Sequence, residues 1–128
     1  MNSLNKMLGA ISGNVLGSVY EFDSTKTKDF ELLGADCFFT DDTVMTIAVA
    51  DSLMNRRNYV ESLQTWARKY PGAGYGGWFH KWIYADFPEP YNSFGNGSAM
   101  RCSSVGWLFD DEETVLKEAE KSAEITHN

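Results

Sequence analysis

Residues 40–54 read Thr-Asp-Asp-Thr-Val-Met-Thr-Ile-Ala-Val-Ala-Asp-Ser-Leu-Met, and this segment decides the fold. From Val44 to Met54 its apolar side chains are spread over nearly every side of a helix. A helix that is apolar all round lies inside a core rather than on its surface. The segment opens with two aspartates between two threonines, and carboxylates suit the positive end of a helix dipole. The sequence therefore predicts a central helix that begins near Thr40.

Other segments on both sides of this helix show apolar residues at spacings of three and four, which is typical of amphipathic helices. They are Leu4–Phe22, Tyr59–Tyr70 and the short Trp78–Ile83. Pro71 and Gly72 predict the end of the second one. No alternating pattern of useful length indicates a strand, so we expect an all-α fold.

A last helix is predicted near the end of the chain. Asp110 is the expected N-cap, with Glu113 three residues later as the partner of a capping box. Leu116, Ala119 and Ala123 are expected to share its packed face. At the other end of the chain, glycines 9, 13 and 17 form a smooth stripe that predicts the close approach of another helix.

Composition limits the class of protein. The chain has 128 residues, 43% of them hydrophobic, which predicts one globular domain. Its net charge of −7 disfavours binding to duplex nucleic acid. No run reaches the ~20 apolar residues of a membrane span, and no cleavage site for export is clear. Cys37 and Cys102 fit no metal-ligand spacing and indicate free thiols, so we expect a cytoplasmic protein without membrane contact.

Three residues at the start of the central helix are candidate metal ligands. Thr40, Asp41 and Asp42 offer hard oxygen donors of the kind that Mg²⁺ or Mn²⁺ prefers. Adjacent side chains on a regular helix point ~100° apart, so they can converge only at a helix start, where these residues lie. The alternative is plain N-capping, which Asp and Thr provide in many helices without any metal.

Three further features are candidate parts of a site, each with a simpler alternative. Glu21 follows an apolar helix that needs no acid. The alternative is that Glu21 is only a solvated residue at a helix end. The loop Ser93-Phe94-Gly95-Asn96-Gly97-Ser98 lets backbone N–H groups approach an anion and offers a ring to a base, or else it is only a turn. His127 is either a substrate contact or a C-cap.

The order of these motifs is more specific than any of them alone. Gly-Ala-x-x-Gly followed by Glu21, then Phe-Thr-Asp-Asp-Thr-Val-Met-Thr, Gly-Asn-Gly-Ser-Ala-Met-Arg and Thr-His resembles the ADP-ribosylglycohydrolase family from Gly9 to His127. The resemblance implies an all-α fold around two Mg²⁺ (or Mn²⁺) ions. It also implies hydrolysis of the bond between ADP-ribose C1″ and an acceptor.

The resemblance also implies roles for individual residues. Thr40, Asp41 and Asp42 match the metal ligands, while Glu21, Asp41 and Asp42 are the expected catalytic acids. The expected contacts to ADP-ribose or to an ADP-ribosylated protein are Ser93, Phe94, Gly95, Asn96, Gly97, Ser98 and His127.

Two departures from the family pattern limit this expectation. Asn14 stands where the family usually has Asp, and the Asp-x-Asp motif of the second half of the family domain is absent. We therefore expect residues 1–128 to be the N-terminal portion of one such domain, with impaired hydrolysis. The alternative is a non-catalytic homologue that binds ADP-ribose or a partner protein. Apolar surface on Trp107, Leu108 and the Thr40 helix, left exposed by the truncation, would favour a homodimer.

Overall fold

The computed structural model describes the backbone of residues 3–128 and the side chains from Lys6 onward, so the predicted contribution of the Leu4 side chain lies outside it. The described residues form helices and no strand, which confirms the all-α prediction. In chain order the elements are α1 (Ser3–Gly17), the 3₁₀ turn η1 (Ser18–Tyr20), α2 (Asp41–Asn55), α3 (Tyr59–Lys69), α4 (Gly77–Ile83), α5 (Gly97–Met100), α6 (Ser103–Leu108) and α7 (Glu112–Glu124).

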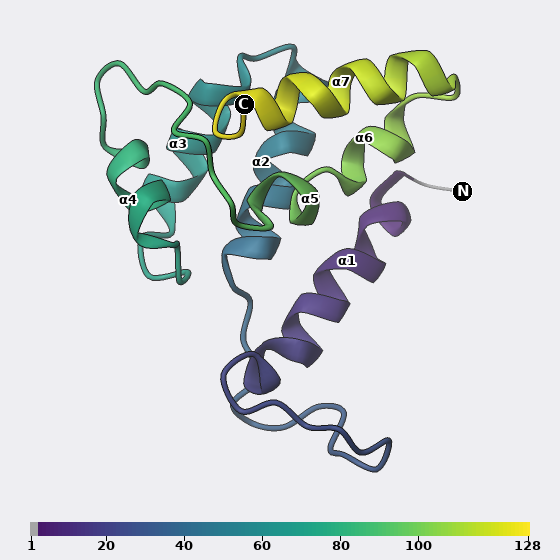
Figure 1. The fold of residues 1–128 in the computed structure, drawn as a ribbon. Coiled ribbons are helices and arrows are strands. Elements are labelled where there is room, and N and C mark those ends of the chain that lie inside the picture. Colours follow the sequence, from purple (N-terminus) through teal and green to yellow (C-terminus); the bar gives the residue numbers. More distant parts are fainter. Residues whose placement is uncertain (1–2) are drawn as a thin grey trace.

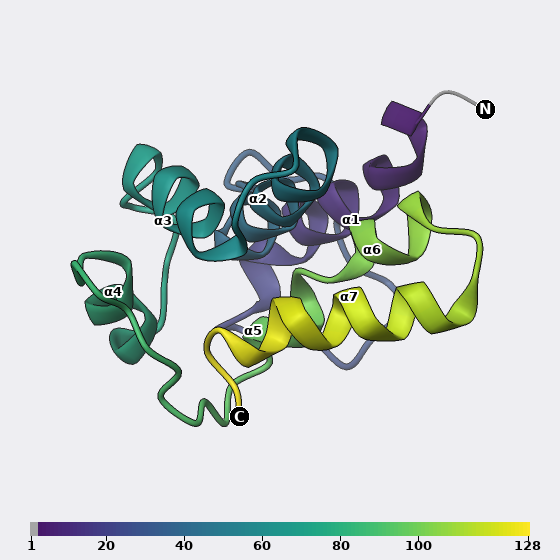
Figure 2. The same cartoon turned by 90° about the horizontal axis from the view of Figure 1, so that it is seen from above.

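Helix α2 is the centre of the fold, as its apolar sequence predicts. It packs against α3, α6, α1 and α5, and Figures 1 and 2 show it surrounded by the other helices. Its buried residues include Val44, Met45, Ala48 and Val49, which join the main core cluster. The expectation that this helix exposes apolar surface is therefore wrong for most of its length, because α3 and α6 cover it. Met54, at its last turn, is exposed.

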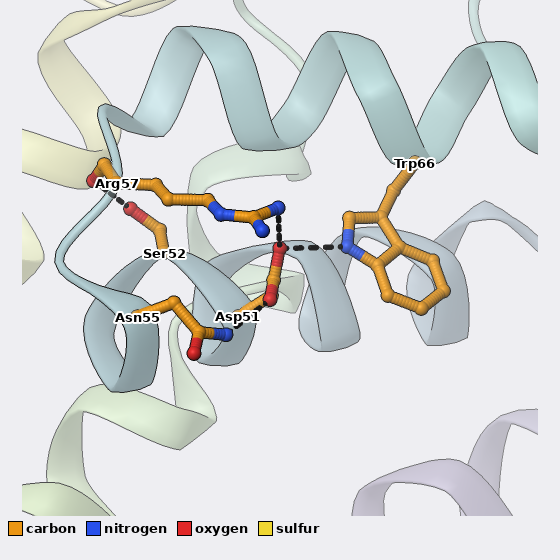
Figure 3. A network of polar contacts seen from close by, with 5 residues as sticks. All are labelled: Asp51, Ser52, Asn55, Arg57 and Trp66. Carbon is orange, nitrogen blue, oxygen red and sulfur yellow. Dashed lines mark hydrogen bonds and ion pairs between the residues drawn. The ribbon is translucent and has the colours of Figure 1, made fainter.

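The turn between α2 and α3 is held by polar contacts around Asp51. Its carboxylate accepts hydrogen bonds from the Trp66 indole nitrogen at 3.1 Å and from Arg57 Nη1 at 3.3 Å (Figure 3). Arg56 closes α2 in the left-handed conformation, with φ at 54°. The Asn58 side chain then caps α3 by accepting from the Val60 N–H at 2.7 Å. These contacts fix the packing of α3 against α2.

The last helix begins one residue later than the sequence predicts. Asp111, not Asp110, is the N-cap of α7, and its side chain accepts a hydrogen bond from the Thr114 N–H at 2.8 Å. Glu113 is therefore not in the capping-box position. Leu116 is exposed, because the face that packs on the core carries Val115 and Ala119 instead.

The glycine stripe of α1 has no close neighbour. A methyl group added at Gly9, Gly13 or Gly17 would meet nothing within 4 Å, so the predicted tight helix contact is wrong for the described residues. A long connection over residues 21–40 follows η1 and extends away from the helices (Figure 1). It carries exposed apolar side chains, among them Phe22 and Leu33. No helix in the described part of the chain has the length and apolar content that crossing a membrane requires.

Candidate functional site

The N-terminus of α2 is organised by a side chain from α1. Thr40 is the N-cap of α2 but makes no capping hydrogen bond with its own side chain. Its backbone N–H donates to Asn14 Oδ1 at 2.9 Å, and the Thr43 hydroxyl donates to the same oxygen at 2.6 Å. Because a backbone N–H can only donate, the oxygen of the Asn14 amide must face Thr40. Asn14 therefore ties α1 to the first turn of α2.

The amide nitrogen of Asn14 points at the predicted ligands. Asn14 Nδ2 donates to Thr40 Oγ1 at 2.6 Å and lies 3.5 Å from Asp42 Oδ2. A neutral amide thus both accepts from and donates to this helix start, which an ionised carboxylate cannot do. Sequence reasoning identified only a missing charge at Asn14, since nothing local to its sequence indicates four contacts to residues 40–43.

Negative charge is concentrated beside this helix start. Burial, followed by the nearby negative charges of Asp42 and Glu21, raises the pKa of Asp41 from 3.8 to about 6. Burial also raises the pKa of Asp42. The three predicted acids therefore lie close enough together for Asp41 to be influenced by both of the others. A bound cation would relieve this repulsion.

Two neighbouring hollows meet at Asp41. The first, here called the acidic recess, has a volume of about 340 Å³ and includes Asn14, Glu21, Asp41 and Asp42 in its lining. The second, here called the glycine-loop cleft, has a volume of about 500 Å³. Asp41, Asn96 and Met100 line both hollows. The carboxyl group of Asp41 thus lies where the acidic recess joins the cleft.

The glycine-loop cleft is formed by segments that are far apart in the sequence. Its lining includes residues 93–97, the first residues of α4 with Trp78 and Phe79, and His127 beyond the end of α7. Figure 2 shows the C-terminal residues beside α5 and the preceding loop. Phe94 is fully exposed at the cleft, and Trp78 is 70% exposed. The ring of Phe94 is therefore free to stack on a planar group, whereas Lys81 Nζ lies over the Trp78 ring, 4.8 Å from its centroid.

The structure places the predicted loop residues 93–97 and His127 together, but not every predicted residue lines a hollow. Thr40 and Ser98 line neither the acidic recess nor the glycine-loop cleft. His127 lines the cleft, yet both ring nitrogens are engaged within the protein. Nδ1 lies 2.8 Å from Thr126 Oγ1, and Nε2 lies 2.9 Å from the Gly95 carbonyl oxygen.

Sequence reasoning gave no role to Arg101, although it ends the Gly-Asn-Gly-Ser-Ala-Met-Arg block. Arg101 is 1% exposed and contributes to the lining of the cleft. Burial lowers its pKa to about 10, so the guanidinium stays charged at neutral pH. One signal was available in the sequence, because Arg101 follows a segment of mostly small and apolar residues. A buried cation in such a segment needs either a polar partner or a function.

The donor atoms present fit a hard divalent cation in kind. Asp41, Asp42 and Glu21 are carboxylates, and the chemistry of Mg²⁺ calls for oxygen ligands. Among the described side chains, no group of three or more His, Cys, Asp or Glu residues is close enough together to hold a metal ion. The predicted ligands therefore have the donor atoms that Mg²⁺ prefers, and their arrangement around a cation remains a prediction.

Comparison with known proteins identifies the family. The family model for ADP-ribosylglycohydrolase matches residues 4–128. The chain belongs to the ADP-ribosylglycohydrolase family. This confirms the resemblance based on the Thr-Asp-Asp-Thr and Gly-Asn-Gly-Ser-Ala-Met-Arg blocks. In this member of the family, the first block forms the start of α2 and includes Asp41, and the second runs from the loop at residue 95 through α5 to Arg101.

Curated relatives of this ADP-ribosylglycohydrolase chain are longer than the chain itself. ADP-ribosylhydrolase ARH3 of Mus musculus is 28% identical over 94% of this chain and 42% of its own length. The ARH3 of Homo sapiens is 29% identical over 94% of this chain and 43% of its own length. The ARH3 of Gallus gallus is 35% identical over 70% of this chain and 29% of its own length. The chain thus spans less than half the length of these relatives.

Proposed function

We propose that this chain contributes to Mg²⁺-dependent (or Mn²⁺-dependent) hydrolysis of the glycosidic bond that joins ADP-ribose to an acceptor, a modified protein being the expected substrate. The observation that carries the proposal is the position of Asp41, which lines both the acidic recess and the glycine-loop cleft. A sugar bound in the cleft would therefore meet carboxylates at the recess. Family membership and the printed activity of the relatives, ADP-ribosylhydrolase, support the same reaction.

In this proposal the cleft binds and orients the nucleotide part of the substrate. Phe94 offers an exposed ring to a base, and the backbone of residues 93–97 approaches the diphosphate. The buried guanidinium of Arg101 places positive charge near this surface in a chain of net charge −7. Ser93, Gly95, Asn96, Gly97, Ser98 and His127 complete the proposed contact set.

The carboxylates carry the proposed chemistry. Thr40, Asp41 and Asp42 would hold the cation, which when bound supplies Lewis-acid activation of water. With the cation bound Asp41 would be ionised, and its carboxylate can accept a proton as a water oxygen attacks C1″. The bond from C1″ to the acceptor breaks, and the proton taken from the water passes to the leaving acceptor, so that one water is added across the bond. Glu21 faces the same recess and stabilises positive charge on the ribose.

We further propose that residues 1–128 form the N-terminal portion of a single ADP-ribosylglycohydrolase domain. The share of the relatives that the chain covers supports this proposal. Two aspartates, one threonine and Glu21 cannot saturate two octahedral ions, so we expect weak Mg²⁺ binding and little hydrolysis from this chain alone. We retain two expectations: a cytoplasmic location, which rests on the unpaired cysteines, and the absence of duplex nucleic acid among its ligands, which rests on its acidic composition.

The test measures release of ADP-ribose from an ADP-ribosylated protein, together with calorimetric titration of the chain with ADP-ribose, with and without Mg²⁺. Binding that Asp41→Asn weakens only in the presence of Mg²⁺ would support the proposed site. Absence of binding under both conditions would refute it. The matched control is Asp86→Asn, which removes one charge from an exposed turn far along the chain from the acidic recess.

A non-catalytic ADP-ribose or partner-protein binder is the second candidate function. The glycine-loop cleft is well formed, while no cluster of three His, Cys, Asp or Glu residues is found among the described side chains. Tight binding of ADP-ribose without hydrolysis, unchanged by Mg²⁺ and by Asp42→Asn, would favour this candidate over the enzyme.

A homodimer remains a proposal as well, resting on exposed apolar side chains. Trp107 is 50% exposed and Leu108 is 40% exposed on α6. Light scattering at high concentration is the measurement, and Trp107→Ser is the variant expected to weaken association. A monomer at every concentration would contradict the proposal.

A further inference from the structure

Arg101 is a buried cation whose hydrogen bonds lead toward the glycine-loop cleft. Its side chain is 1% exposed, and among the described residues it forms no ion pair with a carboxylate. Nη2 donates to the Ser122 carbonyl oxygen at 2.5 Å and to Thr126 Oγ1 at 2.9 Å. Thr126 is itself fully buried. The charge of Arg101 is therefore directed at the end of α7 rather than neutralised by an acid.

The contacts beyond Arg101 have a single consistent direction when His127 is neutral. The Gly95 carbonyl oxygen can only accept, so His127 Nε2, 2.9 Å away, must carry the ring proton. Nδ1 is then an acceptor, so the single hydroxyl proton of Thr126 goes to Nδ1 at 2.8 Å and not to the more distant Ala123 carbonyl oxygen at 3.4 Å. Arg101 has no acceptor atom and can only donate to Thr126. Arg101, Thr126 and His127 thus donate one to the next, and this chain of hydrogen bonds ends at the Gly95 carbonyl oxygen, which accepts.

This chain acts on a peptide group at the mouth of the cleft. The Gly95 carbonyl belongs to the same peptide as the Asn96 N–H, and Asn96 lines both hollows. A donor at the carbonyl oxygen polarises the peptide and strengthens its N–H as a donor. Thr126 also holds the loop through its backbone, because its carbonyl oxygen accepts from the Ser93 N–H at 3.1 Å. The ring of His127 lies against the loop, since a methyl group added at Gly97 would be 3.8 Å from its Cε1.

We propose that Arg101 is a positioning residue which, through the Thr126 hydroxyl and the His127 imidazole, sets the orientation of the Gly95–Asn96 peptide at the cleft. Its effect on ligand affinity rests on the proposed function, namely that the cleft receives ADP-ribose. The relay itself does not, because its hydrogen bonds join only residues of this chain. Both ring nitrogens of His127 are engaged in this relay, so its proposed contact with ADP-ribose would be made by the ring carbons rather than by a ring nitrogen.

A merely structural role for Arg101, tying α5 to α7, predicts a different result. In that case the Thr126 hydroxyl would contribute only by filling space, and not by hydrogen bonding. Its replacement by a methyl group would then leave His127 and the loop unchanged. Thr126→Val makes this replacement with nearly the same shape. Thr126→Ser keeps the hydroxyl and is the conservative variant that should retain the relay.

The experiment records long-range ¹H–¹⁵N spectra of the imidazoles and backbone amide spectra at a pH where both histidines are neutral. The chain has two histidines, and the exposed His80 on α4 serves as the internal reference. We expect the Nδ1 resonance of His127 to differ from that of His80 in the wild type and in Thr126→Ser. In Thr126→Val it should move toward His80, and the Asn96 and Gly97 amides should shift as well. Arg101→Lys should change the same resonances.

Titration with ADP-ribose then tests the consequence for binding. Loss of one relay hydrogen bond should weaken binding by about fivefold to tenfold in Thr126→Val, and Thr126→Ser should restore most of it. Unchanged Nδ1 and amide resonances in Thr126→Val would overturn the proposal, whether or not ADP-ribose binds. Failure of the wild-type chain to bind ADP-ribose, with the resonance pattern as expected, would overturn the proposed function and leave the positioning role supported.

Discussion

The side-chain oxygen of Asn14 accepts a hydrogen bond from the backbone N–H of Thr40 at 2.9 Å, and this contact joins α1 to the start of α2. The same oxygen accepts from the Thr43 hydroxyl, and the amide nitrogen donates to Thr40 Oγ1. One side chain therefore satisfies three polar groups at a helix start whose own N-cap residue makes no capping hydrogen bond with its side chain. The position of Asp41 and Asp42 depends on this arrangement.

Asn14→Ala should lower the free energy of unfolding by about 1–3 kcal/mol, because it leaves the partly buried Thr40 N–H and Thr43 hydroxyl without their acceptor. Denaturant unfolding followed by circular dichroism measures the change. Asn55→Ala is the control, since Asn55 is exposed and bonds only to Asp51 within its own helix. A loss no larger than that of the control would contradict the role given to Asn14.

Asn14→Asp should make the same helix start depend on a cation. The substitution removes the amide donors and places a further carboxylate near Asp42 Oδ2, from which Asn14 Nδ2 now lies 3.5 Å away. Without Mg²⁺ we expect a lower Tm than in the wild type. With Mg²⁺ at ten times its Kd, binding should return about 1.4 kcal/mol. The measurement is Tm against Mg²⁺ concentration, and equal Mg²⁺ responses of variant and wild type would refute the prediction.

The raised pKa of Asp41 predicts a pH-dependent stability. Between its ordinary value of 3.8 and its folded value of about 6, the folded chain keeps a proton that the unfolded chain has released. Stability should therefore fall as the pH rises through this window, and the loss is complete above about pH 6. Asp41→Asn removes the buried charge and should stabilise the chain at pH 8 by about 1 kcal/mol, allowing for solvent screening of a half-exposed group.

This stabilisation should shrink as the pH falls through this window and should vanish near about pH 3, below the ordinary value of 3.8, where Asp41 is protonated in both states of the wild type. Unfolding free energies of wild type and Asp41→Asn at a series of pH values give the comparison. Asp86→Asn, in an exposed turn, controls for the change in net charge. A difference between wild type and Asp41→Asn that is the same at about pH 3 and at about pH 8 would contradict the assignment.

Local sequence predicts where the longer helices occur along the chain. It does not predict which other elements pack against each of them. Apolar residues all round predict α2 in the core, and the observed burial of Met45 and Val49 agrees with that prediction. The stripe of Gly9, Gly13 and Gly17 predicts that a neighbour can approach, but smoothness does not say that one is present. Asp110 and Asp111 are equally good caps in sequence, and only the path of the chain chooses between them.

The candidate site shows the same division. The family resemblance, and not local sequence, predicted Asp41, Asp42 and Glu21 in one site, and in the structure the charges of Asp42 and Glu21 act on Asp41. The contributions of Asn14 and Arg101 depend on contacts over 26 to 29 residues and 21 to 25 residues respectively, which no local pattern encodes. An amide that both donates and accepts, and a buried guanidinium without a carboxylate, become visible only when distant segments are placed side by side.

The choice of cap for α7 is directly testable. The hydrogen bond from the Thr114 N–H lowers the pKa of Asp111, so this cap stabilises the helix when Asp111 is ionised and weakens as the pH falls toward its folded pKa. Asp111→Ala should therefore lower the Tm at pH 7, and the loss should be smaller in acid. Asp110→Ala is the matched control and should change the Tm little at either pH. Equal losses from the two variants would show that the cap is shared.

Asp51 accepts hydrogen bonds from the Trp66 indole and from Arg57 (Figure 3). We expect these two donors to contribute unequally to the free energy of unfolding. Asp51 is 16% exposed at its side chain, whereas that of Arg57 is 49% exposed, so solvent screens their ion pair. The bond from the Trp66 indole, in contrast, is partly buried between α2 and α3. Asp51→Leu should cost about 1–3 kcal/mol because it leaves the indole N–H without an acceptor. Arg57→Gln should cost about 0.5 kcal/mol or less, because it removes only the screened pair.

Equilibrium unfolding of the two variants separates these contributions, with far-ultraviolet circular dichroism as the probe of helix content. Asp51→Asn supplies the matched control, since its side-chain oxygen can still accept from the indole while the charge is lost. It should therefore lie between the other two in stability. If Arg57→Gln destabilised the chain as much as Asp51→Leu, the ion pair rather than the indole bond would hold α3 against α2. In that case high salt should also abolish the difference between wild type and Arg57→Gln, because salt screens an exposed pair and leaves a partly buried neutral donor almost unaffected.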